Sequence, residues 1–308
     1  MARIGIVIVT YNSEAVIGEC LDQALKQDAE IVVVDNASAD ATCRVAATRG
    51  VRLIANKWNR GFAAAVNQGF AVLNYRYVLL LNPDAILTSS LSGLVEACDL
   101  PKAAGAGGQL LDVYGKPQIG FMVRRFPTPA ALISEVLLLN KLWPGNPINA
   151  RYRETGFDYA IRQQVEQPAG AFLMIRRAVW HELGGFDERF WPIWFEDVDF
   201  CKRADDCGYR FYYVPSAVAK HTGGHSIPAL TVETRRIYWY GSLLDYAVKH
   251  FSLPSARVVC LAVIAGSFLR AAAESVLARS FRPLASYGQV ARLGCRFLFG
   301  PRRVRCVR

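Results

Sequence analysis

Short polar side chains gather at three points in the first hundred residues, each directly after an apolar run. The three clusters are Thr10-Tyr11-Asn12, Asp35-Asn36-Ala37-Ser38 and Asn82-Pro83-Asp84. At such a position Asp35 can accept a hydrogen bond from the imide N–H of a pyrimidine, with Thr10 and Asn12 offering short polar groups beside it. One cluster of this kind often only caps a helix, but three together favour a ligand-binding site.

A group of acids follows an aromatic segment later in the chain. Glu196, Asp197 and Asp199 come directly after residues 191–195, which include two Trp and one Phe. A carboxylate in the first turn of a helix has its charged form favoured, whereas nearby aromatic surface desolvates it and raises its pKa. Such an acid could act as a general base, or all three acids could simply cap the helix. The tryptophans suit stacking on a sugar and core packing equally well.

The elements that must position these residues alternate between strand and helix. Apolar runs predict strands over residues 4–10, 31–35, 51–55 and 77–82, with helices over 15–26, about 40–50 and 61–73. Residues 112–165 contain five prolines and read as an elaborated insertion. Beyond it we expect strands over 169–175 and 209–214, helices over 177–183 and 196–207, and only helices from residue 231. This alternation predicts an α/β fold with a mostly parallel sheet, whose strand ends would bring the three polar clusters together.

Two nucleotide-binding patterns are absent from the positions where they would be expected. The turn after the first strand, Thr10-Tyr11-Asn12-Ser13-Glu14, contains no glycine, so it is neither a dinucleotide-binding turn nor a P-loop. The later run Gly105-Ala106-Gly107-Gly108 opens no clear helix. We interpret it as a site of close backbone packing.

The motifs, taken in order, resemble those of family-2 inverting glycosyltransferases with the GT-A fold. Besides the three clusters, the resemblance includes Asn59-Arg60-Gly61-Phe62-Ala63, Gly184-Gly185-Phe186-Asp187-Glu188, Phe195-Glu196-Asp197-Val198-Asp199 and His221. It covers about residues 3 to 225, and the Asn-Pro-Asp and Trp-Phe-Glu-Asp-Val-Asp forms are most similar to the rhamnosyltransferase-like branch. The resemblance implies a GT-A sheet flanked by helices, followed by a helical C-terminal appendage.

The resemblance also implies roles for individual residues. Asp197 would be the catalytic base. The donor would be bound by Thr10, Tyr11, Asn12, Asp35, Asn36, Arg60, Asn82 and Asp84, and the acceptor by Trp194, Glu196 and Asp187. Asp84 and His221 would hold a divalent cation, Mg²⁺ or Mn²⁺. The sequence departs from the family's Asp-x-Asp pattern because Asn82 replaces the first acid, and an amide is a weaker ligand.

Simpler interpretations exist for several of these residues. Asp35 could cap the following helix, a role that is compatible with base recognition. Arg60 could be an ordinary surface arginine rather than a diphosphate ligand at a helix start. His221 could be a hydrogen-bonded loop histidine, and Asp187 could only shape its turn.

The positive charge lies almost wholly in the last sixty residues. The chain has a net charge of +10, and residues 249–308 carry eleven Lys and Arg but a single acid, Glu274. The uncharged run 258–269 is shorter than the roughly 20 residues that span a bilayer. We therefore expect residues 1–230 to form the catalytic domain and residues 231–308 a basic appendage on an anionic membrane surface. An ordinary helical appendage or a dimer contact is the alternative.

These observations predict a cytoplasmic protein, peripheral on the inner face of the cell membrane, since residues 1–12 do not resemble a signal peptide. Its partners would be a nucleotide-sugar donor, for which dTDP-rhamnose is the first expectation, and a lipid-linked saccharide acceptor of polysaccharide or cell-wall synthesis. No nucleic-acid-reading motif accompanies the basic tail. A nucleotidyltransferase of related fold and a non-catalytic scaffold remain alternatives, and the oligomeric state is open.

Overall fold

The computed structural model describes residues 4–223 and 231–300, which fall into two compact units. The first unit is drawn from Met1–Phe126, Arg153–Glu188 and Glu196–Ala229, and the second from Pro127–Tyr152, Arg189–Phe195 and Leu230–Arg308. The expected domain boundary lies between residues 230 and 231, and residue 230 is outside the described ranges. Two internal segments, at 127–152 and 189–195, belong with the C-terminal helices.

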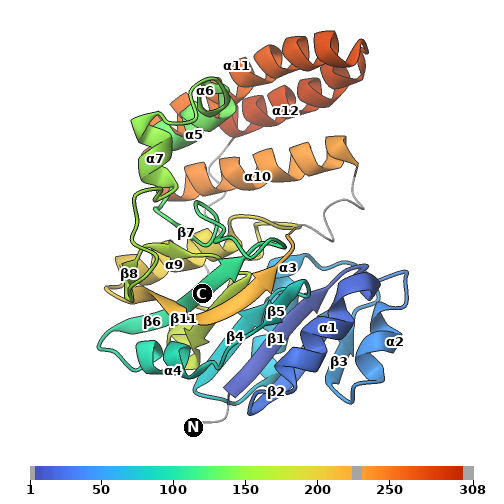
Figure 1. The fold of residues 1–308 in the computed structure, drawn as a ribbon. Coiled ribbons are helices and arrows are strands. Elements are labelled where there is room, and N and C mark those ends of the chain that lie inside the picture. Colours follow the sequence, from blue (N-terminus) through green and yellow to red (C-terminus); the bar gives the residue numbers. More distant parts are fainter. Residues whose placement is uncertain (1–3, 224–230, 301–308) are drawn as a thin grey trace. The chain divides into compact units, whose positions relative to one another are not determined.

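The first unit is built on a nine-stranded sheet with the order β3-β2-β1-β4-β10-β6-β11-β5, to which β8 is added beside β11 (Figure 1). The strands are β1 (Ile4–Thr10), β2 (Ala29–Asp35), β3 (Arg52–Ala55), β4 (Tyr77–Leu81), β5 (Ala85–Leu87), β6 (Ala103–Leu111), β8 (Gln163–Val165), β10 (Phe172–Arg176) and β11 (Arg210–His221). A separate pair joins β7 (Val123–Arg124) to β9 (Gln167–Pro168). The predicted α/β fold class is confirmed.

Helices in the first unit form where apolar residues recur at helical spacing. They are α1 (Glu14–Ala24), α2 (Thr42–Ala47), α3 (Phe62–Val72), α4 (Ser92–Cys98), α8 (Arg177–Glu182) and α9 (Glu196–Asp206). In α1 the buried side chains are Ile17, Cys20, Leu21 and Ala24, which lie on one face of the helix. Every residue of β1 is buried, as expected for a strand that is covered on both faces of its sheet.

Strand register explains why the polar clusters share one edge of the sheet. Strands β1, β2 and β4 are parallel neighbours, and Thr10 pairs directly with Asp35. The same register places Ile8 beside Leu81, so that Asn82 leaves the sheet at the same end. The three clusters are therefore brought to one edge, as the alternation of elements predicted.

Strand β10 departs from the parallel pattern. It runs antiparallel between β4 and β6. Glycines in β6 permit this packing: a Cβ at Gly105 would lie 2.2 Å from the Met174 carbonyl oxygen, and one at Gly108 would lie 2.1 Å from the Phe172 ring. The glycine run is thus a site of close packing, as expected, but it lies within a strand that the sequence did not indicate.

The second unit is helical in its described residues. Its helices are α5 (Pro129–Val136), α6 (Leu139–Leu142), α7 (Pro147–Tyr152), α10 (Val232–His250), α11 (Leu253–Ala278) and α12 (Arg282–Phe299). Arg270 of α11 donates to the carbonyl oxygens of Glu135 and Val136, and Gly266 lets α5 approach α11 closely. Part of the segment expected as an irregular insertion is therefore helical and packs on the C-terminal helices.

Candidate active site

Asp35 organises the turn at the end of β2. Its Oδ1 accepts hydrogen bonds from the hydroxyls of Thr10, at 2.8 Å, and Ser38, at 2.5 Å. Its Oδ2 accepts from the backbone N–H of Ser38 at 2.8 Å, and the side chain is 1 % exposed. This geometry joins the ends of β1 and β2, while the expected contact of Asp35 with a base stays a prediction.

The residues beside Asp35 are held by the same turn. Asn12 has a φ of 50°, and its side-chain oxygen accepts from the N–H of Ala39 at 2.8 Å. Asn36 donates to the carbonyl of Gly61 at 3.1 Å, next to the start of α3. Arg60 is exposed at that helix start, and Tyr11 is partly exposed after β1. Six of the expected donor-binding residues therefore lie at neighbouring strand ends and the turns beside them: Thr10, Tyr11, Asn12, Asp35, Asn36 and Arg60.

Asp84 and His221 meet in the interior, although 137 positions separate them in the sequence. Asp84 Oδ1 lies 3.5 Å from His221 Nε2, and both side chains are only 3 % exposed. Asn82 Nδ2 lies 3.4 Å from the same imidazole nitrogen. Burial lowers the pKa of His221, and the Asp84 carboxylate opposes that shift. His221 is the last residue of β11, which pairs with β5 beside Ala85 and so brings the two side chains together.

Two residues that the sequence did not single out hold the His221 ring. Gln118 contacts both its backbone and its ring: the amide donates to the His221 carbonyl at 2.7 Å, and Oε1 lies 3.0 Å from Nδ1. Phe121 stacks on the imidazole at 5.3 Å between centroids, and the Arg124 guanidinium lies 5.7 Å from the Phe121 ring centre. All three come from the proline-rich segment, where no local pattern marked them.

Asp197 is a partly exposed residue in the first turn of helix α9, and its carboxylate is closely surrounded by protein. Oδ2 accepts from the N–H of Gly170 at 2.9 Å, and Oδ1 accepts from the N–H of Val198 at 2.8 Å. Burial raises the pKa of Asp197, whereas the two N–H groups and the charge of Arg124 oppose the rise. A partly exposed aspartate whose pKa is raised has the properties of a general base.

Gly170 sits where only a small residue fits. A Cβ there would lie 3.0 Å from Asp197 Oδ2 and 3.1 Å from Asp197 Cβ. Sequence reasoning missed this residue. The run of small residues Ala169-Gly170-Ala171 between two strands was the available signal.

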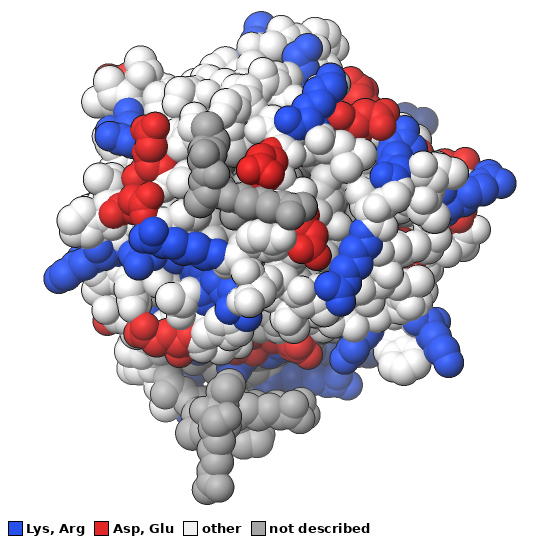
Figure 2. All heavy atoms as spheres, turned by 90° about the horizontal axis from the view of Figure 1, so that it is seen from below, with Lys and Arg blue, Asp and Glu red and all other residues white. Residues whose placement is uncertain are grey.

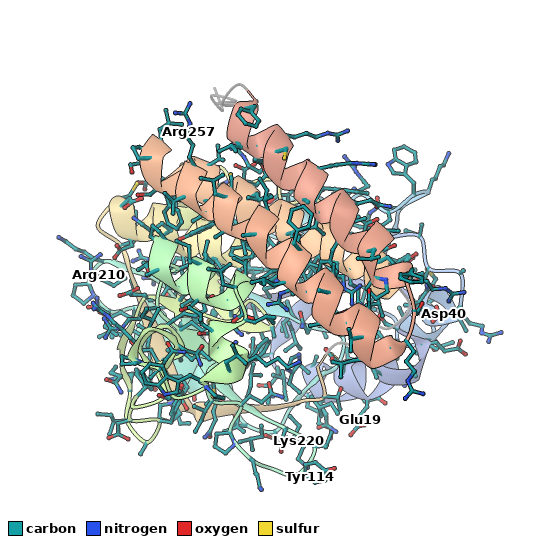
Figure 3. All side chains as sticks on the ribbon, turned by 90° about the horizontal axis from the view of Figure 1, so that it is seen from above. Glu19, Asp40, Tyr114, Arg210, Lys220 and Arg257 are labelled. Carbon is teal, nitrogen blue, oxygen red and sulfur yellow. The ribbon has the colours of Figure 1, made fainter. Side chains whose placement is uncertain are left out.

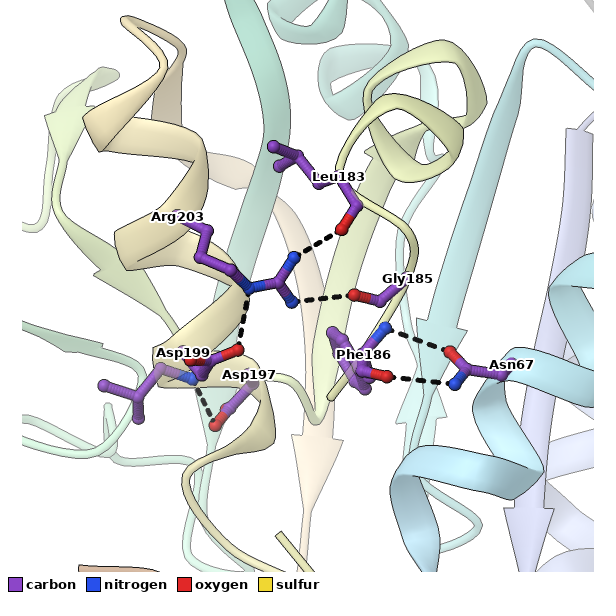
Figure 4. A network of polar contacts seen from close by, with 8 residues as sticks. Asn67, Leu183, Gly185, Phe186, Asp197, Asp199 and Arg203 are labelled. Carbon is purple, nitrogen blue, oxygen red and sulfur yellow. Dashed lines mark hydrogen bonds and ion pairs between the residues drawn. The ribbon is translucent and has the colours of Figure 1, made fainter. Parts of the chain in front are cut away.

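The other two acids of this motif, Glu196 and Asp199, are buried and differ in environment from Asp197, and Figure 4 shows Asp199 in its contacts. Asp199 forms a 2.8 Å ion pair with Arg203, whose guanidinium also donates to the carbonyls of Leu183 and Gly185. Asn67 of α3 holds the next residue of the turn through both the N–H and the carbonyl of Phe186. Asp199 thus stabilises the Gly-Gly-Phe-Asp-Glu turn, while Glu196 is buried at the start of α9.

The expected acceptor-binding residues belong to both units. Asp187 is partly exposed in the turn that Arg203 and Asn67 hold. Trp194 is partly exposed and has a φ of 81°, an unusual backbone conformation for a bulky residue. Trp191 is 53 % exposed and contacts Tyr238 edge to face, so it is not a core residue. Roles for Asp187, Glu196 and Trp194 in acceptor binding stay predictions.

Two protein-family models match the part of the chain that contains this site. The model described as "Glycosyl transferase family 2" matches residues 5–184, which include the first three polar clusters. A second model, described as "N-terminal domain of galactosyltransferase", matches residues 153–225 and so includes Asp197 and His221.

Individual proteins resemble the chain over much of its length. N-acetylglucosaminyl-diphospho-decaprenol L-rhamnosyltransferase of Mycobacterium tuberculosis is 31 % identical over 223 residues, covering 67 % of this chain and 70 % of the relative. Rhamnosyltransferase WbbL of Escherichia coli is 28 % identical over 170 residues, covering 54 % and 60 %. A mannosyltransferase of Pyrobaculum calidifontis, solved with GDP-Man and Mn²⁺, superimposes with a TM-score of 0.54 at 16 % identity, covering 97 % of this chain and 87 % of that one.

Proposed function

The chain belongs to glycosyltransferase family 2, and from this premise we propose that it transfers rhamnose from a nucleoside diphosphate to a lipid-linked saccharide. Family membership and the GT-A-like fold identify it as an inverting glycosyltransferase, as the sequence motifs indicated. The rhamnosyl donor and the polyprenyl-linked acceptor are suggested by the names of its relatives from Mycobacterium tuberculosis and Escherichia coli. Such a product would serve polysaccharide or cell-wall synthesis.

The observation that carries the proposed mechanism is the setting of Asp197. Inversion needs a base that removes the proton from the acceptor hydroxyl while the oxygen attacks the anomeric carbon opposite the leaving group. Asp197 is a partly exposed residue whose carboxylate has a raised pKa, and two backbone N–H groups fix its orientation. The new C–O bond forms as the bond to the nucleoside diphosphate breaks, and the acceptor proton ends on Asp197.

The strand-end clusters would bind the donor. We assign base recognition to Asp35, whose carboxylate is buried beside Thr10. Asn12 and Asn36 would shape the adjoining turns, with Tyr11 beside them. Arg60, exposed at the start of α3, is placed to meet a diphosphate with the N–H groups of that helix. Asn82 and Asp84 would lie next to the phosphates at the end of β4.

Asp84 and His221 fit a divalent cation such as Mg²⁺ or Mn²⁺. They present a carboxylate oxygen and an imidazole nitrogen that face each other at 3.5 Å in a buried setting. Within residues 4–223 and 231–300, no three His, Cys, Asp or Glu side chains form a cluster able to hold an ion alone. The remaining coordination would come from donor phosphates and water, a common arrangement for Mg²⁺. When bound, the ion would neutralise charge on the departing diphosphate.

A lipid-linked acceptor requires access to a membrane, and α11 offers a surface for it. The side chains of Val258, Leu261, Phe268, Leu269 and Val276 are 50–77 % exposed and lie on one face of the helix. Arg257, Arg279, Arg282, Arg292 and Arg296 are exposed on α11, α12 and the turn between them, and Figure 3 shows these two helices side by side. We propose that this face rests on anionic lipid at the cytoplasmic surface.

The length of α11 bears on this proposal. It is the one helix in the described residues that is long and apolar enough to cross a membrane, with mean hydropathy 1.7 over 18 residues. The uncharged run 258–269 is thus only the centre of a 26-residue helix. However, 44 % of the apolar window is buried in the structure. Because α11 has one exposed face and one packed face, we favour a helix that lies in the membrane–water interface over one that crosses the bilayer.

The deciding experiment is a transfer assay with a panel of nucleotide sugars and a polyprenyl-diphosphate saccharide acceptor, with and without Mn²⁺ or Mg²⁺. We expect dTDP-rhamnose to be used, and Asp197→Asn to lower transfer about 10²- to 10⁴-fold while nucleotide binding is kept. Asp206→Asn, at the exposed end of the same helix, is the matched control. Failure of every nucleotide sugar to react would contradict the proposal, and pyrophosphate release from a nucleoside triphosphate would indicate a nucleotidyltransferase instead.

A further inference from the structure

The two contacts between Gln118 and His221 determine which ring nitrogen carries the proton. The Gln118 amide NH₂ faces the backbone carbonyl of His221 at 2.7 Å, and a carbonyl can only accept. The orientation of the amide is therefore fixed, with Oε1 towards His221 Nδ1 at 3.0 Å. Since Oε1 can only accept, Nδ1 must be the donor. In the neutral imidazole, Nε2 then carries no proton and can accept from the Asn82 amide, whose Nδ2 lies 3.4 Å away.

The unprotonated nitrogen points at the proposed cation ligand. Nε2 lies 3.5 Å from Asp84 Oδ1, so a lone pair faces a carboxylate oxygen in a buried site. The opposite tautomer would place a proton between them and close the site with a direct hydrogen bond. An Nδ1–H imidazole instead leaves two acceptors facing each other, an arrangement that a cation stabilises.

Gln118 is itself firmly placed. Its N–H donates to the Leu110 carbonyl at the end of β6, and its own carbonyl accepts from the N–H groups of Phe121 and Met122. The same turn brings the Phe121 ring onto the face of the imidazole at an interplanar angle of 14°. The ring is thus held by Gln118 at its edge and by Phe121 on its face.

We infer that Gln118 is a positioning residue, which keeps the His221 proton on Nδ1 and so holds Nε2 ready as a cation ligand opposite Asp84. This inference rests on the proposed cation site. Because the hydrogen bonds of Gln118 exist without any ion, the tautomer can be measured in the metal-free protein. That measurement is independent of whether a cation binds.

The test is ¹⁵N NMR of the histidine rings in the full chain at pH 7.5 without metal, with the His221 signals assigned through His221→Gln. We expect protonated Nδ1 and unprotonated Nε2 in the parent protein. Gln118→Met removes both contacts and should shift the ring towards Nε2–H, which can donate to Asp84. Gln118→Glu keeps an acceptor for Nδ1–H but loses the donor to the backbone, so it should retain the original tautomer. Gln164→Met, at an exposed position in β8, is the control.

A second readout is Mn²⁺ affinity in the presence of dTDP, measured by electron paramagnetic resonance. We expect Gln118→Met to weaken Mn²⁺ binding about 10- to 100-fold, and Gln118→Glu to stay within a few-fold of the parent. An Nε2–H ring in the parent protein would overturn the inference, and so would a Gln118→Met variant with unchanged tautomer and affinity. If the tautomer follows Gln118 but the parent protein binds no more Mn²⁺ than Asp84→Asn does, the proposed cation site fails. The role of Gln118 towards a cation then fails with it.

Discussion

At the scale of single residues, burial and backbone hydrogen bonds act in opposite directions on the pKa of Asp197. Two N–H groups stabilise its charged form, yet burial has the larger effect and raises its pKa. A general base acts only when deprotonated. We therefore expect kcat/KM to fall as the pH is lowered through a pKa above the usual range of an aspartate, in a pH–rate profile of the free enzyme. An acid limb at the ordinary aspartate pKa would contradict this assignment.

The close approach of Gly170 to Asp197 leads to a second prediction at this scale. Gly170→Ala places a methyl group 3.0 Å from Asp197 Oδ2, so the carboxylate must move away from the N–H that orients it. The carboxylate must give by a few tenths of an ångström, and because a displacement of about 1 Å can cost roughly 10²-fold in rate, we expect a loss of about 3- to 10-fold in kcat with nucleotide affinity kept. Gly156→Ala, where an added Cβ meets nothing within 4 Å, is the control. Full activity of Gly170→Ala would show that Asp197 needs no such orientation.

At the scale of elements, Arg203 connects α9 to the turn after α8. Removing its guanidinium in Arg203→Met leaves the fully buried Asp199 without its ion pair and two carbonyls without their donor. Breaking a buried pair in this way costs about 3 kcal/mol of unfolding free energy, measurable by denaturant titration. Lys202→Met breaks the exposed pair with Asp206 on the same helix and should cost less than about 0.5 kcal/mol. Equal effects of the two variants would contradict a structural role for Asp199.

The elements also show what local sequence patterns can and cannot predict. The ends of β1, β2 and β4 were predictable because consecutive parallel strands carry their polar residues to one edge. The antiparallel insertion of β10 between β4 and β6 was not, since strand order depends on pairing between residues about 70 positions apart. Gln118 and Gly170 were missed for the same reason. Each acts through a partner distant in sequence, 103 positions for Gln118 and 27 for Gly170.

At the scale of the whole molecule, charge is divided between a neutral part and a basic one. Basic and acidic side chains are interspersed on the face that Figure 2 shows. Residues 249–308 carry the net charge, although the four arginines after residue 300 lie outside the described residues. Attraction to an anionic surface should therefore depend on the C-terminal part of the chain and weaken at high salt.

The apolar face of α11 allows the membrane proposal to be tested without deleting the tail. The double variant Leu261→Glu/Phe268→Glu adds charge at two side chains that are 53 % and 66 % exposed. Each of these side chains would contribute roughly 1.5–3 kcal/mol if fully buried in lipid, so co-sedimentation with vesicles containing phosphatidylglycerol should weaken at least about tenfold. Val113→Glu/Ile161→Glu adds the same charge at exposed apolar positions in the first unit and should leave binding within about twofold. If the α11 variant binds vesicles normally but changes from dimer to monomer in sedimentation velocity, the face is a dimer contact and the membrane assignment is wrong.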